Sequence, residues 1–215
     1  IHQFLRLTET GTLKDILFCF ALFGGIITSL ICFRQVDLKS LIAYSSVGHI
    51  SLVLAGVFSG SSWGWQAALR IILAHGLCSS ALFALANFNY EKTNTRRLII
   101  SKGILLLCPI ISMWWFLFCA VNIASPPSIN LISEIMVFPA IIFNRLWLLV
   151  PVALMSFLAA VYNLFLYTTT QHGRAPKFLL PLKTINSPAL LLLLLHYIPV
   201  NLLILKTDRI CSWIL

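Results

Sequence analysis

The 215-residue chain is 60% hydrophobic and 10% charged, with a mean hydropathy of +0.96 and a formal net charge of +9. Because soluble domains carry about 25% charged residues, this composition excludes a soluble globular domain and indicates a membrane protein. The basic residues are spread thinly between apolar runs and are not interleaved with aromatic residues, which argues against a nucleic-acid-binding surface and assigns the charge to loops at the membrane boundary.

Seven apolar stretches follow one another along the chain, and a helix needs about 20 apolar residues to cross a bilayer. The chain shows no strand pattern, so we predict an all-α membrane protein with a single transmembrane domain over residues 1–215. About seven helices are expected, one or more of them discontinuous. The predicted helices cover residues 15–33, 38–58, 64–90, 103–122, 128–143, 146–169 and 188–205.

Loop charge gives an expected orientation if all seven stretches cross the membrane. The positive-inside rule makes the side with more Lys and Arg the inner, or matrix, face. Nine basic residues fall on one side, namely Arg34, Lys39, Lys92, Arg96, Arg97, Lys102, Arg145, Lys206 and Arg209, and five fall on the other, namely Arg6, Lys14, Arg174, Lys177 and Lys183. One miscounted helix would invert this assignment.

The second apolar stretch carries titratable side chains in the motif D-L-K-S-L-I-A-Y-S-S-V-G-H, residues 37–49. A charge deep in hydrocarbon costs about 2.5–3.5 kcal/mol on insertion scales, so such a group usually faces a bundle interior or a water path. Lys39 could instead extend to the interface from the end of a helix. His49 follows about 15 Å further along a continuous helix, and two titratable groups on one helix are typical of a proton path.

Glu134 is the one acidic residue that lies within an apolar stretch, because the other five lie at helix ends or in loops. It follows S-P-P-S-I-N-L-I-S, in which Pro126 and Pro127 each remove a backbone donor and break any helix through them. Broken membrane helices persist only where protein or water satisfies the freed backbone groups. We therefore predict a proton or cation site at Glu134. The alternative is a carboxyl that apolar packing keeps protonated, without a transport role.

His75 and Arg70 lie in the third apolar stretch, five residues apart. His75, in the motif A-H-G-L-C-S-S, is equally compatible with a structural role and with a site. Arg70 could pair with a carboxylate or reach the interface, and the sequence leaves both open.

Motifs for cofactors and metals are missing from the sequence. The six cysteines form no C-x-x-C pair, and there is no Gly-rich phosphate loop, dinucleotide fingerprint or metal cluster. We expect the chain to bind no cofactor or metal and to hold no catalytic residue, so that other subunits would carry any covalent chemistry.

Three motifs occur in the order R-Q-V-D-L-K-S-L-I-A-Y-S-S-V-G-H-I, A-H-G-L-C-S-S-A-L-F-A-L-A-N-F-N-Y-E and P-P-S-I-N-L-I-S-E. This series resembles the antiporter-like membrane-arm subunits of mitochondrial NADH:ubiquinone oxidoreductase, respiratory complex I, and most of all the subunit 4 branch of that family. The resemblance runs over nearly all of the chain. It covers only the C-terminal half of the 14-helix fold that such subunits have.

The resemblance implies site residues and a role in the inner mitochondrial membrane. Lys39 matches the family's mid-membrane lysine, Glu134 its acidic residue near the broken helix, and His49 and His75 positions of the polar axis. In that family, energy from quinone reduction drives protons along a hydrated chain of Lys, His and Glu, and apposed groups of this kind titrate as coupled pairs. The expected proton-transfer residues are therefore Lys39, Glu134, His75 and His49.

The resemblance also implies partners. They are other membrane-arm subunits, membrane lipids and, unless the sequence is truncated, a second chain that supplies the missing N-terminal half; nucleic acid is not among them. Flavin, iron–sulfur clusters and ubiquinone are expected in other subunits. Two alternatives stay open: a subunit of a stand-alone cation/proton antiporter, and a half-subunit that only braces the membrane arm.

Overall fold

The computed structural model describes residues 12–142, 146–174 and 186–207. All regular structure within these ranges is helical, apart from an isolated bridge between Asp37 and Arg97. This confirms the predicted all-α membrane fold. The elements are α2 (Thr12–Cys32), α3 (Leu38–Phe58), α4 (Ser62–Thr93), α5 (Ile104–Leu107), α6 (Pro109–Asn122), α7 (Ile129–Ile142), η1 (Leu146–Leu148), α8 (Leu149–Gln171), α9 (Ser187–Leu202) and η2 (Leu203–Lys206).

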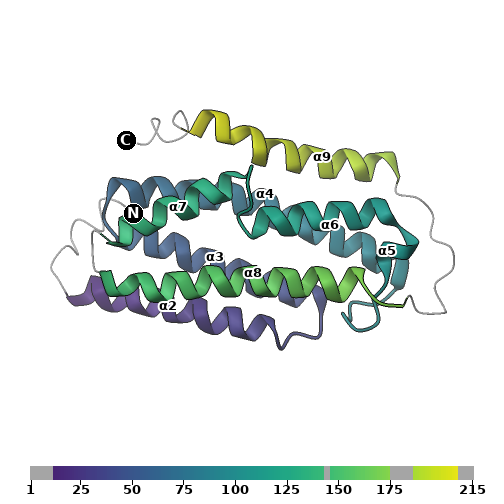
Figure 1. Ribbon diagram of the computed structural model, residues 1–215, viewed down its shortest axis with the longest axis horizontal. Coiled ribbons are helices and arrows are strands. Elements are labelled where there is room, and N and C mark those ends of the chain that lie inside the picture. Colours follow the sequence, from purple (N-terminus) through teal and green to yellow (C-terminus); the bar gives the residue numbers. More distant parts are fainter. Residues whose placement is uncertain (1–11, 143–145, 175–185, 208–215) are drawn as a thin grey trace.

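Five helical segments are long and apolar enough to cross a membrane, and α6 and α7 are shorter apolar helices. Each of these two has 14 residues and so a length of about 21 Å, short of the ~30 Å hydrocarbon core. Figure 1 shows them one after the other alongside α4. Together they form one discontinuous traverse, which confirms that a helix is discontinuous and leaves six traverses in the described part of the chain.

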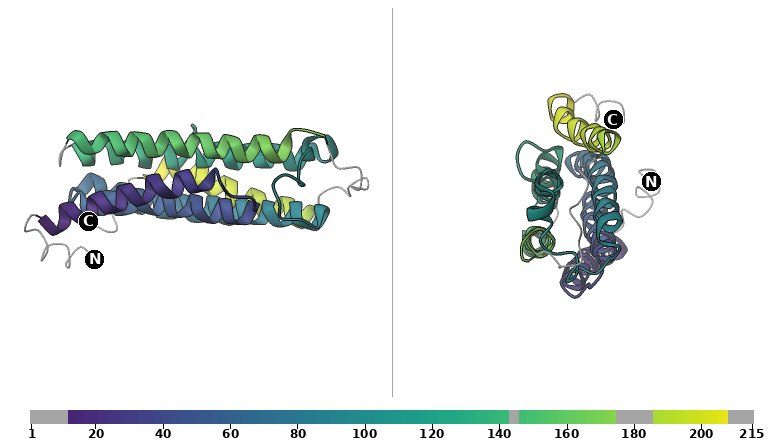
Figure 2. Two further views of the ribbon diagram at one scale, coloured as in Figure 1. Left: turned by 90° about the horizontal axis from the view of Figure 1, so that it is seen from below. Right: turned by 90° about the vertical axis from the view of Figure 1, so that its right-hand side faces the viewer.

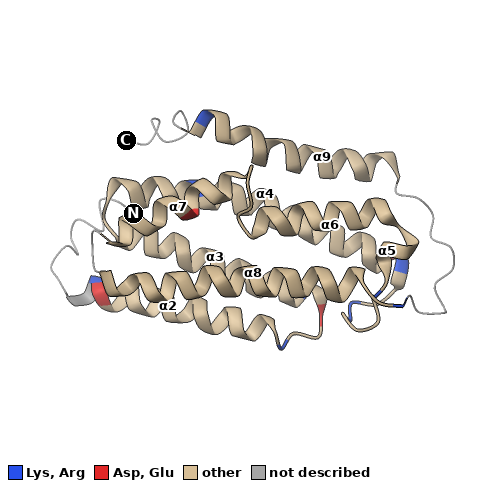
Figure 3. Cartoon of the chain, viewed as in Figure 1, with Lys and Arg blue, Asp and Glu red and all other residues tan. Residues whose placement is uncertain are grey.

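This arrangement corrects the loop-charge count, which assumed seven separate crossings. A Cβ atom on Gly173 would lie at van der Waals distance from the Lys102 side chain. Arg174 therefore lies at the same end of the bundle as the α4–α5 loop. Lys14, in contrast, reaches the α3–α4 turn at Ser59. Figure 3 shows the charge colours mostly at the two ends. By the helix bounds and these contacts, one end has Arg34, Lys39, Lys92, Arg96, Arg97, Lys102 and Arg174, whereas the other has Lys14 and Lys206. Arg6, Arg145, Lys177, Lys183 and Arg209 lie outside the described residues.

The helices form two layers with α9 along one edge, as the end-on view in Figure 2 shows. One layer holds α2, α3 and α4, and the other holds α6, α7 and α8. Between the layers, α2 packs on α8 and α4 packs on α6 and α7. Side chains from both layers meet along this interface, and the buried polar groups described below lie there.

Gly25 of α2 permits a close approach of α2 to α3 and α8. A Cβ atom at this position would overlap Ser51 Oγ and Met155 Cε, whereas one at Gly24 would meet nothing within 4 Å. Of the two neighbouring glycines, only Gly25 is a packing point. Small residues of this kind let membrane helices approach closely.

Side chains donate hydrogen bonds to backbone carbonyls that are freed at the break between α6 and α7. Ala124 takes a positive φ of 64°, and the Pro126–Pro127 peptide bond is cis. The Asn130 amide donates to the carbonyl of Val121 at 3.0 Å, and the Ser128 hydroxyl donates to the carbonyl of Ser125 at 2.6 Å. The free carbonyls of a helix that ends inside a membrane need hydrogen-bond donors, and these bonds supply them.

Candidate functional site

His49 and His75 lie against each other between α3 and α4. Their ring centroids are 4.6 Å apart, with the planes inclined by 28°. The residues are 2% and 9% exposed. His49 Nε2 and both ring nitrogens of His75 have no hydrogen-bond partner in the described part of the protein. The structure thus joins two predicted site residues into one pair with unused donor and acceptor positions.

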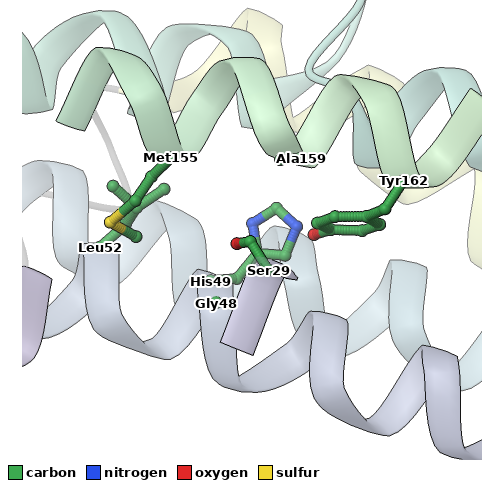
Figure 4. A pocket seen from close by; sticks show the side chains of 7 residues that line it. All are labelled: Ser29, Gly48, His49, Leu52, Met155, Ala159 and Tyr162. Carbon is green, nitrogen blue, oxygen red and sulfur yellow. The ribbon is translucent and has the colours of Figure 1, made fainter. Parts of the chain in front are cut away.

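A small cavity adjoins His49 where α3 faces α2 and α8. It has a volume of about 10 Å³, close to the smallest space that holds one water molecule. Figure 4 shows the Tyr162 hydroxyl, from α8, pointing toward the His49 imidazole. The cavity is lined by Ser29, Gly48, His49, Leu52, Met155, Ala159 and Tyr162. Gly48 keeps this space open, because a Cβ there would contact the hydroxyls of Ser29 and Tyr162.

Glu134 lies on α7, less than two turns beyond the helix break. It lines a second cavity of similar size with Leu52, Val137, Phe138, Val152 and Ser156. Leu52 is the one residue that lines both cavities. Leu52 therefore borders both the cavity beside His49 and the one beside Glu134. The Glu134 carboxyl forms no hydrogen bond or ion pair with the residues that the structure describes.

Lys39 lies apart from these three residues, in the first turn of α3. It is half-buried, and its Nζ is 5.9 Å from the centroid of the Tyr90 ring, which the Arg96 guanidinium also approaches at 5.3 Å. Leu52, beside Glu134, follows Lys39 by about 20 Å along α3. Lys39 thus lies near the basic end of the bundle, His49 and His75 lie in its middle, and Glu134 lies further on.

Arg70 occupies a position that the sequence left open. It is 3% exposed, its Nη1 contacts the sulfur of Met136 on α7, and its Nε lacks a partner among the described residues. It lies five residues before His75 on α4. The guanidinium is therefore buried against α7 and does not reach the interface.

Two buried asparagines near the histidines were not predicted. Asn122 ends α6 and lies close to both imidazoles, although the ring nitrogens named above remain without a well-formed hydrogen bond. Its Nδ2 donates to Asn163 Oδ1 of α8 at 2.9 Å. Both asparagines are buried. An amide within an apolar stretch was the available signal, since burial of such a group requires a partner.

Comparisons with known proteins agree with this architecture. The family model described as NADH:quinone oxidoreductase/Mrp antiporter, TM, matches residues 1–160. Relatives named NADH-ubiquinone oxidoreductase chain 4 are 50% identical in Lumbricus terrestris and 42% identical in Aedes aegypti; each match covers 90% of this chain and 43% of the relative. The chain therefore spans less than half the length of these relatives. A shorter relative of the same name from Anopheles arabiensis is 43% identical, with 90% of this chain and 88% of the relative covered.

Solved structures share the fold at low sequence identity. The respiratory complex I of Thermus thermophilus with bound NADH contains a chain that matches with a TM-score of 0.79 and 19% identity, over 93% of this chain and 44% of that one. The Mrp complex of a Dietzia species matches with a TM-score of 0.79 and 16% identity, over 93% and 45%. These two likenesses establish the fold and do not by themselves identify an activity.

Proposed function

Because the chain belongs to the NADH:quinone oxidoreductase/Mrp antiporter transmembrane family, we propose that it is the C-terminal part of subunit 4 of respiratory complex I. In this proposal it is a multi-pass protein of the inner mitochondrial membrane that conducts protons. Other subunits would hold flavin, iron–sulfur clusters and ubiquinone and carry out the electron transfer. Its partners would be further membrane-arm subunits, a second chain or segment that completes the N-terminal half, and lipids.

Glu134 and the His49–His75 pair beside small cavities between the helices, with Lys39 at the basic end of the same helix as His49, support this proposal. Each histidine can accept a proton on one ring nitrogen and release one from the other. The cavity beside His49 has room for about one water, and Tyr162 and Ser29 offer hydroxyls to it. A proton could therefore pass between His49 and a cavity water without entering hydrocarbon.

Two gaps separate these groups and define where the path must open. Leu52 lies between the His49 cavity and the Glu134 cavity. Lys39 lies ten residues before His49, about 15 Å along α3. Continuous conduction therefore requires further water or side-chain movement at both places, which provides a means of coupling proton transfer to events elsewhere in the complex.

Glu134→Gln tests the proposal in the assembled complex reconstituted into vesicles. The substitution keeps the side-chain shape and removes the exchangeable carboxyl proton. We expect proton pumping to be lost while NADH-driven quinone reduction continues at a lower rate. A pH-sensitive dye measures the number of protons moved per electron, and a native gel with peptide identification checks assembly and the presence of a second chain. Glu91→Gln is the matched control, because Glu91 is exposed and bonded to Asn87.

The alternatives predict other results. Unchanged pumping stoichiometry in Glu134→Gln would defeat the assignment. Sodium- or potassium-dependent proton transport without NADH would indicate a subunit of a stand-alone cation/proton antiporter. If Lys39→Ala and Glu134→Ala changed only the amount of assembled complex, the chain would serve as a structural brace.

A further inference from the structure

Asn122 and Asn163 form a buried amide pair between α6, which is a half-length helix, and α8, which is a full-length helix. Both are 1% exposed. A primary amide has two donor hydrogens and one acceptor oxygen, and leaving them without partners in an apolar interior is costly. The bonds of the pair therefore determine how each amide is oriented.

A backbone carbonyl fixes the orientation of Asn163. Its Nδ2 donates to the carbonyl oxygen of Ala159 at 2.8 Å, and that oxygen can only accept. The Asn163 oxygen consequently points away from Ala159, and it accepts from Asn122 Nδ2 at 2.9 Å. Reversing either amide would place two oxygens or two N–H groups against each other.

The oxygen of Asn122 is directed by the same bonds. It accepts from the Cys78 thiol at 3.9 Å, on the helix that carries His75, and has a second lone pair to offer. Cys78 follows His75 by one turn of α4, and the Asn122 side chain neighbours both imidazoles. The group that faces the histidine pair is therefore an acceptor, beside ring nitrogens that have no other partner.

We propose that Asn122 is a positioning residue for the histidine pair, and that Asn163 holds the Asn122 carbonyl oxygen toward the imidazoles. The oxygen accepts a hydrogen bond from an imidazole N–H and so favours the state in which the pair carries an excess proton. Hydrogen bonds to charged groups are stronger than neutral ones, and more so in a low-dielectric interior. Asn122 neither gains nor loses a proton. This inference rests on the proposed role of the histidines in proton transfer.

Substitutions at both asparagines test the inference in the assembled, reconstituted complex. Asn122→Leu removes the acceptor and keeps the branching of the side chain. Asn122→Asp retains the acceptor when its carboxyl is protonated, because the O–H then donates to Asn163 Oδ1 in place of the amide N–H. Asn163→Leu leaves Asn122 in place without its orienting partner. We expect Asn122→Leu to slow proton pumping roughly tenfold, Asn163→Leu to slow it less, and Asn122→Asp to restore at least half of the rate lost in Asn122→Leu.

The double variant separates orientation from packing. If Asn163 acts only through Asn122, adding Asn163→Leu to Asn122→Leu causes no further loss of pumping, whereas independent structural effects add. Additive losses, or an Asp variant as slow as the Leu variant, would overturn the inference. If Asn122→Leu does not assemble, Asn163→Leu decides: normal pumping there would overturn the inference, and slowed pumping would support it.

His75→Gln distinguishes this inference from the function on which it rests. Normal pumping in that variant would remove the histidine relay and the role of Asn122 together. Loss of pumping in His75→Gln with normal pumping in Asn122→Leu would overturn only the positioning role.

Discussion

The imidazoles of His49 and His75 stack at 4.6 Å across the α3–α4 contact, and three of their four ring nitrogens are buried without a hydrogen-bond partner among the described residues. Two positive charges at this separation repel by about 3–4 kcal/mol at an effective dielectric constant of 20. The pair therefore holds at most one excess proton and acts as one unit. A proton arriving at one ring requires any proton already held by the other to leave.

This pairing predicts that single and double histidine substitutions have similar effects. We expect His49→Gln and His75→Gln each to abolish most proton pumping, and the double variant to lose no more than either one, because residues that act as a unit are not additive. Protons moved per electron in vesicles would measure this. His172→Gln, at an exposed position, should pump normally. A double variant much slower than both single variants would show that the rings work independently.

Leu52 is predicted to act as the apolar barrier between the histidine and glutamate cavities. Leu52→Ala would join the two cavities and give water a place between His49 and Glu134. We expect a faster passive proton leak under an imposed voltage without NADH, measured by the decay of a pH gradient. Leu54→Ala is the control, because Leu54 is 39% exposed on the same helix. An unchanged leak in Leu52→Ala would show that the barrier lies elsewhere.

The neighbouring glycines of α2 should differ in their tolerance of a methyl group. Gly25→Ala forces Ser51 and Met155 to move, and overpacking of this kind typically costs about 1–3 kcal/mol. Gly24→Ala meets nothing within 4 Å and gains the better helix propensity of alanine, by up to about 1 kcal/mol. The thermal midpoint of the assembled complex should fall for the first variant and hold or rise for the second. Equal midpoints would contradict the close approach at Gly25.

For Arg70 we predict that a substitution does not lower the thermal midpoint, in contrast to Gly25→Ala. Its guanidinium is buried against Met136 and makes no ion pair with any described residue. Burying a single charge has a desolvation cost of several kcal/mol that only partner groups can offset. Arg70→Met should therefore leave the thermal midpoint unchanged or raise it. A lower midpoint would indicate that another chain or segment supplies an acidic partner.

Much of this arrangement followed from sequence. The bounds of α3 coincide with the predicted stretch 38–58, because apolar runs with polar ends mark membrane helices well. The contact of His49 and His75 was also within reach. They lie ten residues before and fourteen residues after the Ser59–Ser61 turn, so an antiparallel pair of helices places them within about one helical turn of the same depth.

Other features depend on contacts between distant segments. The prolines predicted a break, but the end-to-end placement of α6 and α7 along α4 is set by tertiary packing. The Asn122–Asn163 bond joins residues 41 positions apart, and no local spacing reports it. The resemblance implied a mid-membrane Lys39, whereas the structure places it in the first turn of α3, beside Tyr90 and Arg96.

Because the number of traverses is even, the first described helix, α2, begins at the same end of the bundle at which the last one, α9, finishes (Figure 1). Tags attached near Thr12 and after Lys206 would therefore report the same compartment, and a protease added to one side of sealed vesicles would remove both or neither. A seventh full crossing would have separated them.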